Sequence, residues 1–175
     1  MKYIINENQI GYLTRNGVFR KVLEPGRYSY LPAMGYDVKV VSAKGEVDTC
    51  GIPAKKLQQD AFFAANTVEK TVPSGSFAFI IADGIPVRCV TAGTALWWKL
   101  FEDVEIRMVT PESPEISADF PRELLNAANI SVVSRLAVPV GAVSMLYYDN
   151  TFVRELPTGV YWFWKNGVEV THRQV

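Results

Sequence analysis

The sequence predicts a mainly β protein with short α-helices, in which one antiparallel sheet pattern occurs three times. A two-residue turn signal lies at three places: Asn16-Gly17, Asp83-Gly84 and Asp149-Asn150. Each turn is followed nine residues later by a glycine: Gly26, Gly93 and Gly159. These glycines are 67 and 66 residues apart, and short apolar segments typical of strands surround each of them. This period predicts three tandem antiparallel β-sheet repeats of about 66 residues, packed as one body.

The composition excludes several classes of protein. The 175 residues carry 18 basic and 18 acidic side chains, so no net field would attract nucleic acid or an anionic membrane surface. A hydrophobic content of 49% argues against disorder. Cys50 and Cys89 are too few for a disulfide framework and are expected to be reduced, buried thiols. The apolar runs have only strand length, so we expect no direct membrane insertion by this segment and a cytoplasmic location.

The first repeat shows the expected strands and turns most clearly. Four strands are expected in it, over residues 10–15, 18–23, 27–31 and 37–41. Asn16-Gly17 predicts a type I′ hairpin turn, which needs positive φ at both residues. Gly26 is expected at the left-handed position of a type II turn. The second copy is expected at 76–82, 85–90, 94–98 and 104–109, and the third at 142–148, 151–156, 160–164 and 168–171.

Two aligned positions in these strands predict how the strands pack. The first strands share a small residue, which indicates close approach of another strand or of a sister repeat: Gly11, Ala78 and Ser144. The second strands alternate poorly, which predicts a β-bulge or an edge position. They share a basic residue that would block unwanted pairing at such an edge: Lys21, Arg88 and Arg154.

Two segments between the repeats have helical patterns. Residues 52–63 have Pro53 at the first helical position, and residues 119–128 contain Pro121 with Asp119 as a candidate cap. The predicted organisation therefore has five segments that together form one compact unit. They are β-repeat 1 over 1–46, a helical linker over 47–66, β-repeat 2 over 67–110, a helical linker over 111–130 and β-repeat 3 over 131–175.

The sequence contains no pattern typical of catalysis or metal binding. His172 is the single histidine, and no nucleophile elbow, phosphate-binding loop or dinucleotide fingerprint is present. The carboxylates are scattered, and nothing in the pattern supplies a base that would activate Cys89. We therefore expect a protein that is not an enzyme and that uses no cofactor and no metal.

The tryptophans are the one unusual concentration of side chains. Trp97 and Trp98 are neighbours, and neighbours on a strand point to opposite faces. Either one of these two rings is exposed, or both faces of the strand are covered. An exposed ring could stack on a sugar or anchor a protein partner, whereas covered rings would pack between repeats. The candidate interaction surface consists of Trp97, Trp98, Trp162 and Trp164.

The order of these motifs resembles a known family. Residues 6–13, 16–17 and 22–28 resemble the opening of bacterial slipins, which are stomatin-like members of the band 7 (SPFH) superfamily, and the resemblance continues through 119–125 and 153–165. The chain looks like the repeat region that precedes the band 7 domain, and the repeat also looks like those of the major vault protein. The resemblance implies a membrane-associated, oligomeric scaffold. The band 7 domain itself would begin near residues 168–174, at the end of the sequence. That domain usually provides ring assembly and membrane attachment, so the resemblance implies these two properties only loosely.

The sequence favours two functions over a third, an enzyme with a site at a repeat junction, for which it shows no unique polar cluster. The first is a non-enzymatic protein-interaction or assembly module of a slipin-like, membrane-associated scaffold, which binds a protein partner or itself and no nucleic acid. Such a module would be cytoplasmic and peripheral to the membrane through the band 7 region. The second is a carbohydrate- or small-ligand-binding β-repeat protein that uses exposed tryptophans. The sequence does not decide whether the repeats close around a pseudo-threefold axis or stack linearly.

Overall fold

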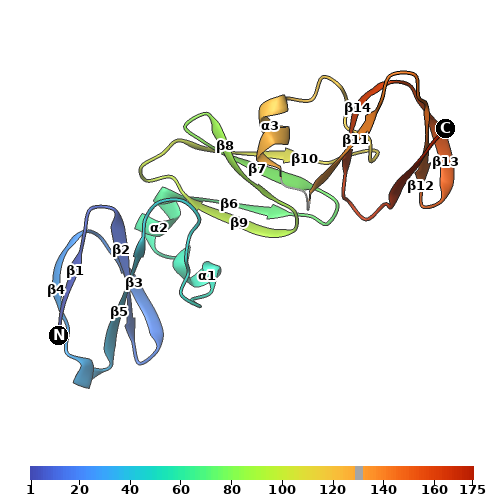
Figure 1. The fold of residues 1–175 in the computed structure, drawn as a ribbon. Helices are drawn as coiled ribbons and strands as arrows, with labels where there is room; N and C mark the ends of the chain where they lie inside the picture. Colours follow the sequence, from blue (N-terminus) through green and yellow to red (C-terminus); the bar gives the residue numbers. More distant parts are fainter. Residues whose placement is uncertain (129–131) are drawn as a thin grey trace. The chain divides into compact units, whose positions relative to one another are not determined.

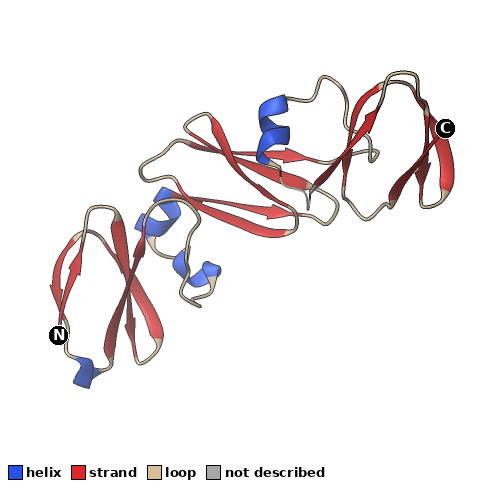
Figure 2. Cartoon of the chain, viewed as in Figure 1, coloured by secondary structure: helices blue, strands red, loops and turns tan. Residues whose placement is uncertain are grey.

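The computed structural model describes residues 1–128 and 132–175, and it is mainly β with short helices, as the sequence predicts (Figure 2). Its strands are β1 (Lys2–Ile5), β2 (Gln9–Arg15), β3 (Val18–Leu23), β4 (Gly26–Ser29), β5 (Tyr36–Ser42), β6 (Thr67–Val72), β7 (Phe77–Ala82), β8 (Ile85–Val90), β9 (Gly93–Trp98), β10 (Val104–Val109), β11 (Val133–Val138), β12 (Ser144–Tyr148), β13 (Thr151–Leu156), β14 (Gly159–Trp164) and β15 (Val170–Gln174). Its helices are the 3-10 helix η1 (Pro32–Met34) and the α-helices α1 (Ala54–Leu57), α2 (Ala61–Asn66) and α3 (Arg122–Ala127). The predicted boundary between the second linker and β-repeat 3, at 130 and 131, lies outside the described residues.

The described strands form small antiparallel sheets in which one strand order is found in three places (Figure 1). The sheet β1-β4 accompanies β3-β2-β5, the sheet β6-β9 accompanies β10-β7-β8, and the sheet β11-β14 accompanies β13-β12-β15. Each set therefore has five strands where the sequence predicts four. The additional strands are β1, β6 and β11, in which few side chains are buried, so the apolar pattern that would predict a strand is weak. The period of about 66 residues remains a prediction.

The chain divides into two compact units. Unit 1 contains Met1–Lys70 and Ala95–Val104, and unit 2 contains Thr71–Thr94 and Glu105–Val175. The divisions between the units fall within β6 and β9 and at the start of β10, so these strands contribute residues to both. The five predicted segments and their packing as one body remain predictions.

The three hairpin turns have the backbone that the sequence predicts. The residues at both turn positions have positive φ, between 48° and 79°, as a type I′ turn requires: Asn16, Gly17, Asp83, Gly84, Asp149 and Asn150. The type II turn predicted at Gly26 is wrong, however, because Gly26 has a φ of 154°, far from the value of about 80° in such a turn. The corresponding Gly159 has a similar φ of 157°. Both glycines instead begin β4 and β14 in an extended conformation with positive φ that favours glycine.

The strands β3, β8 and β13 are bulged edge strands, as predicted. Each lies at the edge of its three-stranded sheet. Each is out of register by one residue with the central strand, at Leu13/Thr14, Ile80/Ile81 and Leu146/Tyr147. The aligned basic side chains Lys21, Arg88 and Arg154 directly follow the bulge and are exposed. A bulge and a long cation both oppose pairing with a foreign strand.

The helical segment after the first set of strands differs from the prediction. The expected single helix over 52–63 is two short helices, α1 and α2, and Pro53 is the N-cap of α1 rather than its first helical residue. The break lies at Asp60, whose carboxylate accepts hydrogen bonds of 3.0 Å from the amides of Phe63 and Val22. Asp60 therefore caps α2 and also attaches it to β3.

Two other predicted boundaries are wrong. Asp119 does not cap α3, because Pro121 holds the N-cap position and the Asp119 carboxylate accepts a hydrogen bond from the Ser117 hydroxyl. The last strand is expected at 168–171 but lies at Val170–Gln174. Before the strand begins, Glu169 bonds to the hairpin turn: its amide donates a hydrogen bond of 2.9 Å to the Asp149 carboxylate, and its carbonyl accepts one from the Asp149 amide.

Candidate interaction surface

Each three-stranded sheet has an inner and an outer face. Side chains alternate between the faces of a strand. In the first and third sheets the inner face packs against the accompanying two-stranded sheet, as Leu13 of β2 does with Ile5 of β1 in unit 1 and Leu146 of β12 with Val138 of β11 in unit 2. The opposite face is called the outer face here. Its central-strand residues are Ile10, Tyr12 and Thr14 in β2, Phe77, Phe79 and Ile81 in β7, and Met145 and Tyr147 in β12 together with Val143, which directly precedes β12.

The outer face of the first sheet is covered within unit 1. Ile10 and Tyr12 are fully buried in one core with Leu57 of α1, Phe63 of α2 and Trp98 of β9. The Trp98 and Phe63 rings meet edge-on, 5.3 Å between centroids. The Tyr12 hydroxyl donates a hydrogen bond of 2.8 Å to the Asp48 carbonyl, and burial raises the pKa of this tyrosine.

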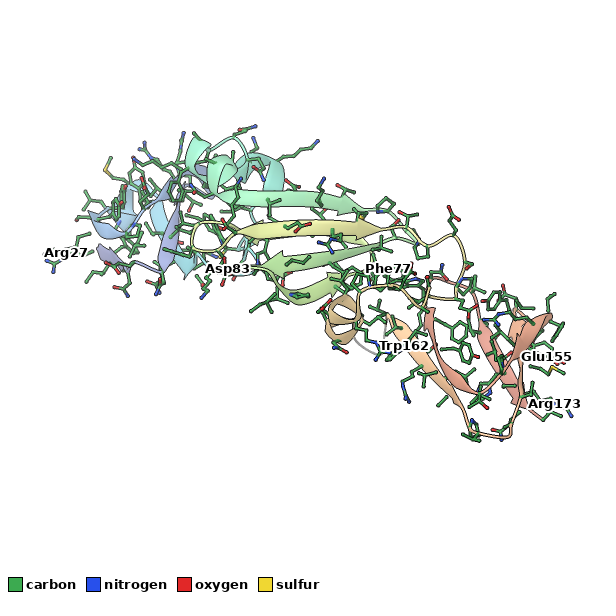
Figure 3. The ribbon with its side chains drawn as sticks, turned by 90° about the horizontal axis from the view of Figure 1, so that it is seen from above. Arg27, Phe77, Asp83, Glu155, Trp162 and Arg173 are labelled. Carbon is green, nitrogen blue, oxygen red and sulfur yellow. The ribbon has the colours of Figure 1, made fainter. Side chains whose placement is uncertain are left out.

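The outer face of the second sheet is covered in a corresponding way within unit 2. Phe77 and Phe79 are buried with Leu124 and Leu125 of α3 and with Trp164 of β14. The Trp164 ring stacks on the Phe77 ring, with 4.6 Å between the ring centroids; Phe77 is labelled in Figure 3. A short helical segment and a tryptophan at the end of a strand therefore cover both of these outer faces.

The outer face of the third sheet is left partly exposed. Val143 is 38% exposed, and Met145 and Tyr147 are half-buried. Phe152 of β13 pairs with Tyr147, is 52% exposed, and meets the tyrosine ring edge-on at 5.9 Å. This exposed apolar group of Val143, Met145, Tyr147 and Phe152 is called the third outer face below.

Charged side chains flank the third outer face. Met145 pairs with Glu155 on one side and with Arg173 on the other, so both lie beside it in the sheet; both are labelled in Figure 3. At the position of Glu155 the first two sheets have Val22, which is buried, and Cys89, which packs against a core. The third sheet thus combines exposed aromatic rings with a polar border, which is typical of a protein-binding surface.

The tryptophans proposed from the sequence are mostly in the cores. Trp97, Trp98 and Trp164 are buried, and Trp162 is half-buried. Both faces of the end of β9 are therefore covered, which was one of the two predicted arrangements. Trp162 lines a shallow groove of about 550 Å³ beside Arg135 and Lys165.

The third outer face is not predicted from the sequence. Large residues occupy the outer-face positions of the central strand in all three sets, and their size does not indicate whether a helix or a tryptophan covers them. Glu155 is the one residue in the sequence that indicates exposure of this face, because the aligned positions in the first two sets hold Val22 and Cys89. A buried outer face would not tolerate an unpaired carboxylate.

Unit 1 also has a cleft of about 710 Å³ between β3, β5 and the segment around α1. Its lining includes Arg20, Lys39, Cys50 and Asp60. Burial, together with the nearby carboxylate of Asp48, raises the pKa of Cys50, so its thiol is not activated as a nucleophile. The Asp60 carboxylate is occupied by two backbone amides. The Asp60 carboxylate in this cleft therefore has a structural role.

Cys50 and Cys89 are free thiols, and both are partly rather than fully buried. Within residues 1–128 and 132–175, no three His, Cys, Asp or Glu side chains are grouped so that they could hold a metal ion. In the same residues, no helix combines the length and the apolar character that crossing a membrane requires.

Comparison with known proteins does not assign the chain to a family. No protein-family model, no curated protein and no solved structure matches it. The resemblance to slipins therefore remains a prediction from the sequence motifs.

Proposed function

We propose that this chain is a protein-interaction and assembly module, and that a protein partner binds the third outer face. One observation carries the proposal: the outer faces of the first two sheets are buried, whereas the equivalent third face is exposed. Exposed aromatic and apolar side chains that lie together mark interaction sites in folded proteins. Phe152 and Tyr147 supply the rings, and Glu155 and Arg173 supply the polar border.

The proposal includes the repeat organisation predicted from the sequence. Three tandem units of about 66 residues are supported by the common strand order and by the bulge at the same position in each set. In tandem repeats each unit buries its face against the next, and the final unit presents a different surface. The third outer face fits that role.

A slipin-like scaffold is the setting that we propose for this module. The sequence motifs support it, and so does an exposed surface suited to assembly. The module would act in the cytoplasm and reach the membrane surface through a band 7 region. It would recruit protein rather than nucleic acid, since the formal net charge of the chain is zero.

The experiment is site-specific photo-cross-linking in cells. A photoreactive phenylalanine analogue replaces Phe152, and the matched control carries it at Val140, which is 91% exposed in a turn. We expect protein adducts from position 152 and far fewer from position 140. Equal yields at the two positions, or no adduct at 152, would contradict the proposed function.

The second candidate function is binding of a carbohydrate or another small ligand. One observation favours it: Trp162 is half-buried and lines the groove of about 550 Å³ beside Arg135. A sugar stacked on this ring would change the tryptophan fluorescence. We expect a saturable change on titration with the correct sugar, lost in Trp162→Phe and kept in Trp98→Phe. No saturable change with any member of a broad panel of sugars would remove this candidate.

A further inference from the structure

A second exposed apolar group lies in unit 1, at the end where β1 begins and β4 finishes. Met1, Leu31 and Met34 are 66%, 59% and 51% exposed. They lie together because the Met1 amino group donates a hydrogen bond to the Tyr30 carbonyl and the Met34 amide donates one to the Leu31 carbonyl. In Figure 1 the N-terminus lies beside η1, which contains Met34. This group is called the unit 1 end.

Leu31 has the same place in its set of strands as the two tryptophans that cover outer faces. Leu31, Trp98 and Trp164 each follow the glycine that begins β4, β9 or β14 by five residues. Trp98 covers Ile10 and Tyr12, and Trp164 covers Phe77. Leu31 is the one of the three that is exposed.

One chain therefore contains an exposed outer face and, in Leu31, an exposed residue at the position that covers an outer face in the other two sets. We propose that the third outer face binds the unit 1 end of a second copy of this chain, with Leu31 placed near Met145 and Tyr147. This inference rests on the proposed function, because it names the partner of that surface. The contact joins two different surfaces, so it is heterologous and can continue from copy to copy.

The contact is expected to be weak when compared with the two internal ones. Leu31 is smaller than tryptophan, and η1 is shorter than the helical segments that cover the first two faces. Few apolar side chains are available on either side, and Glu155 and Arg173 keep the border hydrated. An interface with so few apolar side chains is typical of transient association, so we expect a dissociation constant between about 10 µM and 1 mM.

The experiment measures the mass of the full chain by sedimentation between about 10 µM and 1 mM, the range given above. The wild type is expected to form species larger than a dimer as its concentration rises. Phe152→Glu removes the third outer face, and Leu31→Glu removes the unit 1 end. Each variant alone should stay monomeric. A mixture of the two should form a one-to-one dimer and nothing larger, because each variant keeps one intact surface.

Matched controls separate this effect from a general effect of added charge. Val140→Glu and Ile85→Glu each place the same charge on an exposed branched side chain of unit 2, and both should associate like the wild type. Circular dichroism checks that each variant is folded. Monomeric wild type across the concentration range would overturn the inference. So would a Leu31→Glu variant that still dimerises, since that result would mean that two third outer faces pack together.

The cross-linking result separates failure of the inference from failure of the proposed function. Adducts at position 152 with a different protein, together with a monomeric chain, would retain the interaction module and overturn the self-association. Absence of both adducts and association would overturn both.

Discussion

At the residue scale, single side chains at corresponding places have different environments. Gly11, Ala78 and Ser144 share one position and are all buried against the inner side of their sheets. At Gly11 the space is so small that an added Cβ would lie 2.7 Å from Ile5 Cδ1 and 3.0 Å from Val38 Cγ1. The close approach predicted from the sequence is thus confirmed at Gly11, and Ile5 on the neighbouring strand β1 is its cause.

The Gly11→Ala variant should lower the free energy of unfolding by about 1–3 kcal/mol, because the added methyl group overpacks this site. The measurement is urea unfolding of the purified chain. Removing the contacting methyl group in the double variant Gly11→Ala with Ile5→Val should restore part of the loss. If the two changes were simply additive, the contact with Ile5 would not be the cause.

At the element scale, short helices are positioned by specific side-chain hydrogen bonds. The α2 helix has six residues, too few to be stable by propensity alone. The Asp60 carboxylate holds its first turn through the Phe63 amide and attaches it to β3 through the Val22 amide. Phe63, carried by this helix, then covers the first outer face. One carboxylate therefore links the capping of a helix to the closure of a core.

The Asp60→Ala variant should destabilise the chain by about 2 kcal/mol, because it removes a cap and leaves a partly buried amide without its acceptor. Thermal unfolding measures the effect. Asp119→Ala is the matched control, since Asp119 precedes α3 without capping it, and it should change stability by less than about 0.5 kcal/mol. A larger effect of Asp119→Ala than of Asp60→Ala would contradict this account.

At the scale of the whole molecule, each unit contains a partly or fully buried acidic group that is neutral at pH 7. Burial raises the pKa of Cys89 in unit 2 to about 11, and it also raises the pKa of Tyr12 in unit 1. The unfolded chain would release these protons at lower pH than the folded chain. The contribution of each group to the free energy of unfolding is therefore fully present below the pKa of the group in the unfolded chain. It is lost as pH rises through the pKa of the group in the folded chain.

The free energy of unfolding should accordingly fall between about pH 9 and pH 11. Urea unfolding at several pH values across this range measures the decrease. The Cys89→Ala variant should show a shallower decrease than the wild type, and Tyr12→Phe should act in the same direction at the upper end. Parallel curves for the wild type and Cys89→Ala would show that the buried thiol does not contribute.

The sequence by itself determined the local features of this protein. The hairpin turns follow from Asn, Asp and Gly at positions that need positive φ, and the bulged edge strands follow from the poor alternation around Lys21, Arg88 and Arg154. The mainly β class follows from the spacing of these signals. Such features depend on neighbouring residues, so they can be predicted without knowing the fold.

Only the tertiary structure decided which surfaces are covered. Val143 and Phe77 are both large and apolar at equivalent positions, yet one is exposed and the other is buried beneath Trp164. Likewise, Leu31 and Trp98 share a position and differ in exposure. Burial depends on segments that are distant in the sequence, such as α2 and α3, which no local pattern at these residues reports. The candidate site is therefore a property of the packing between elements, and its residues could be recognised only after that packing was known.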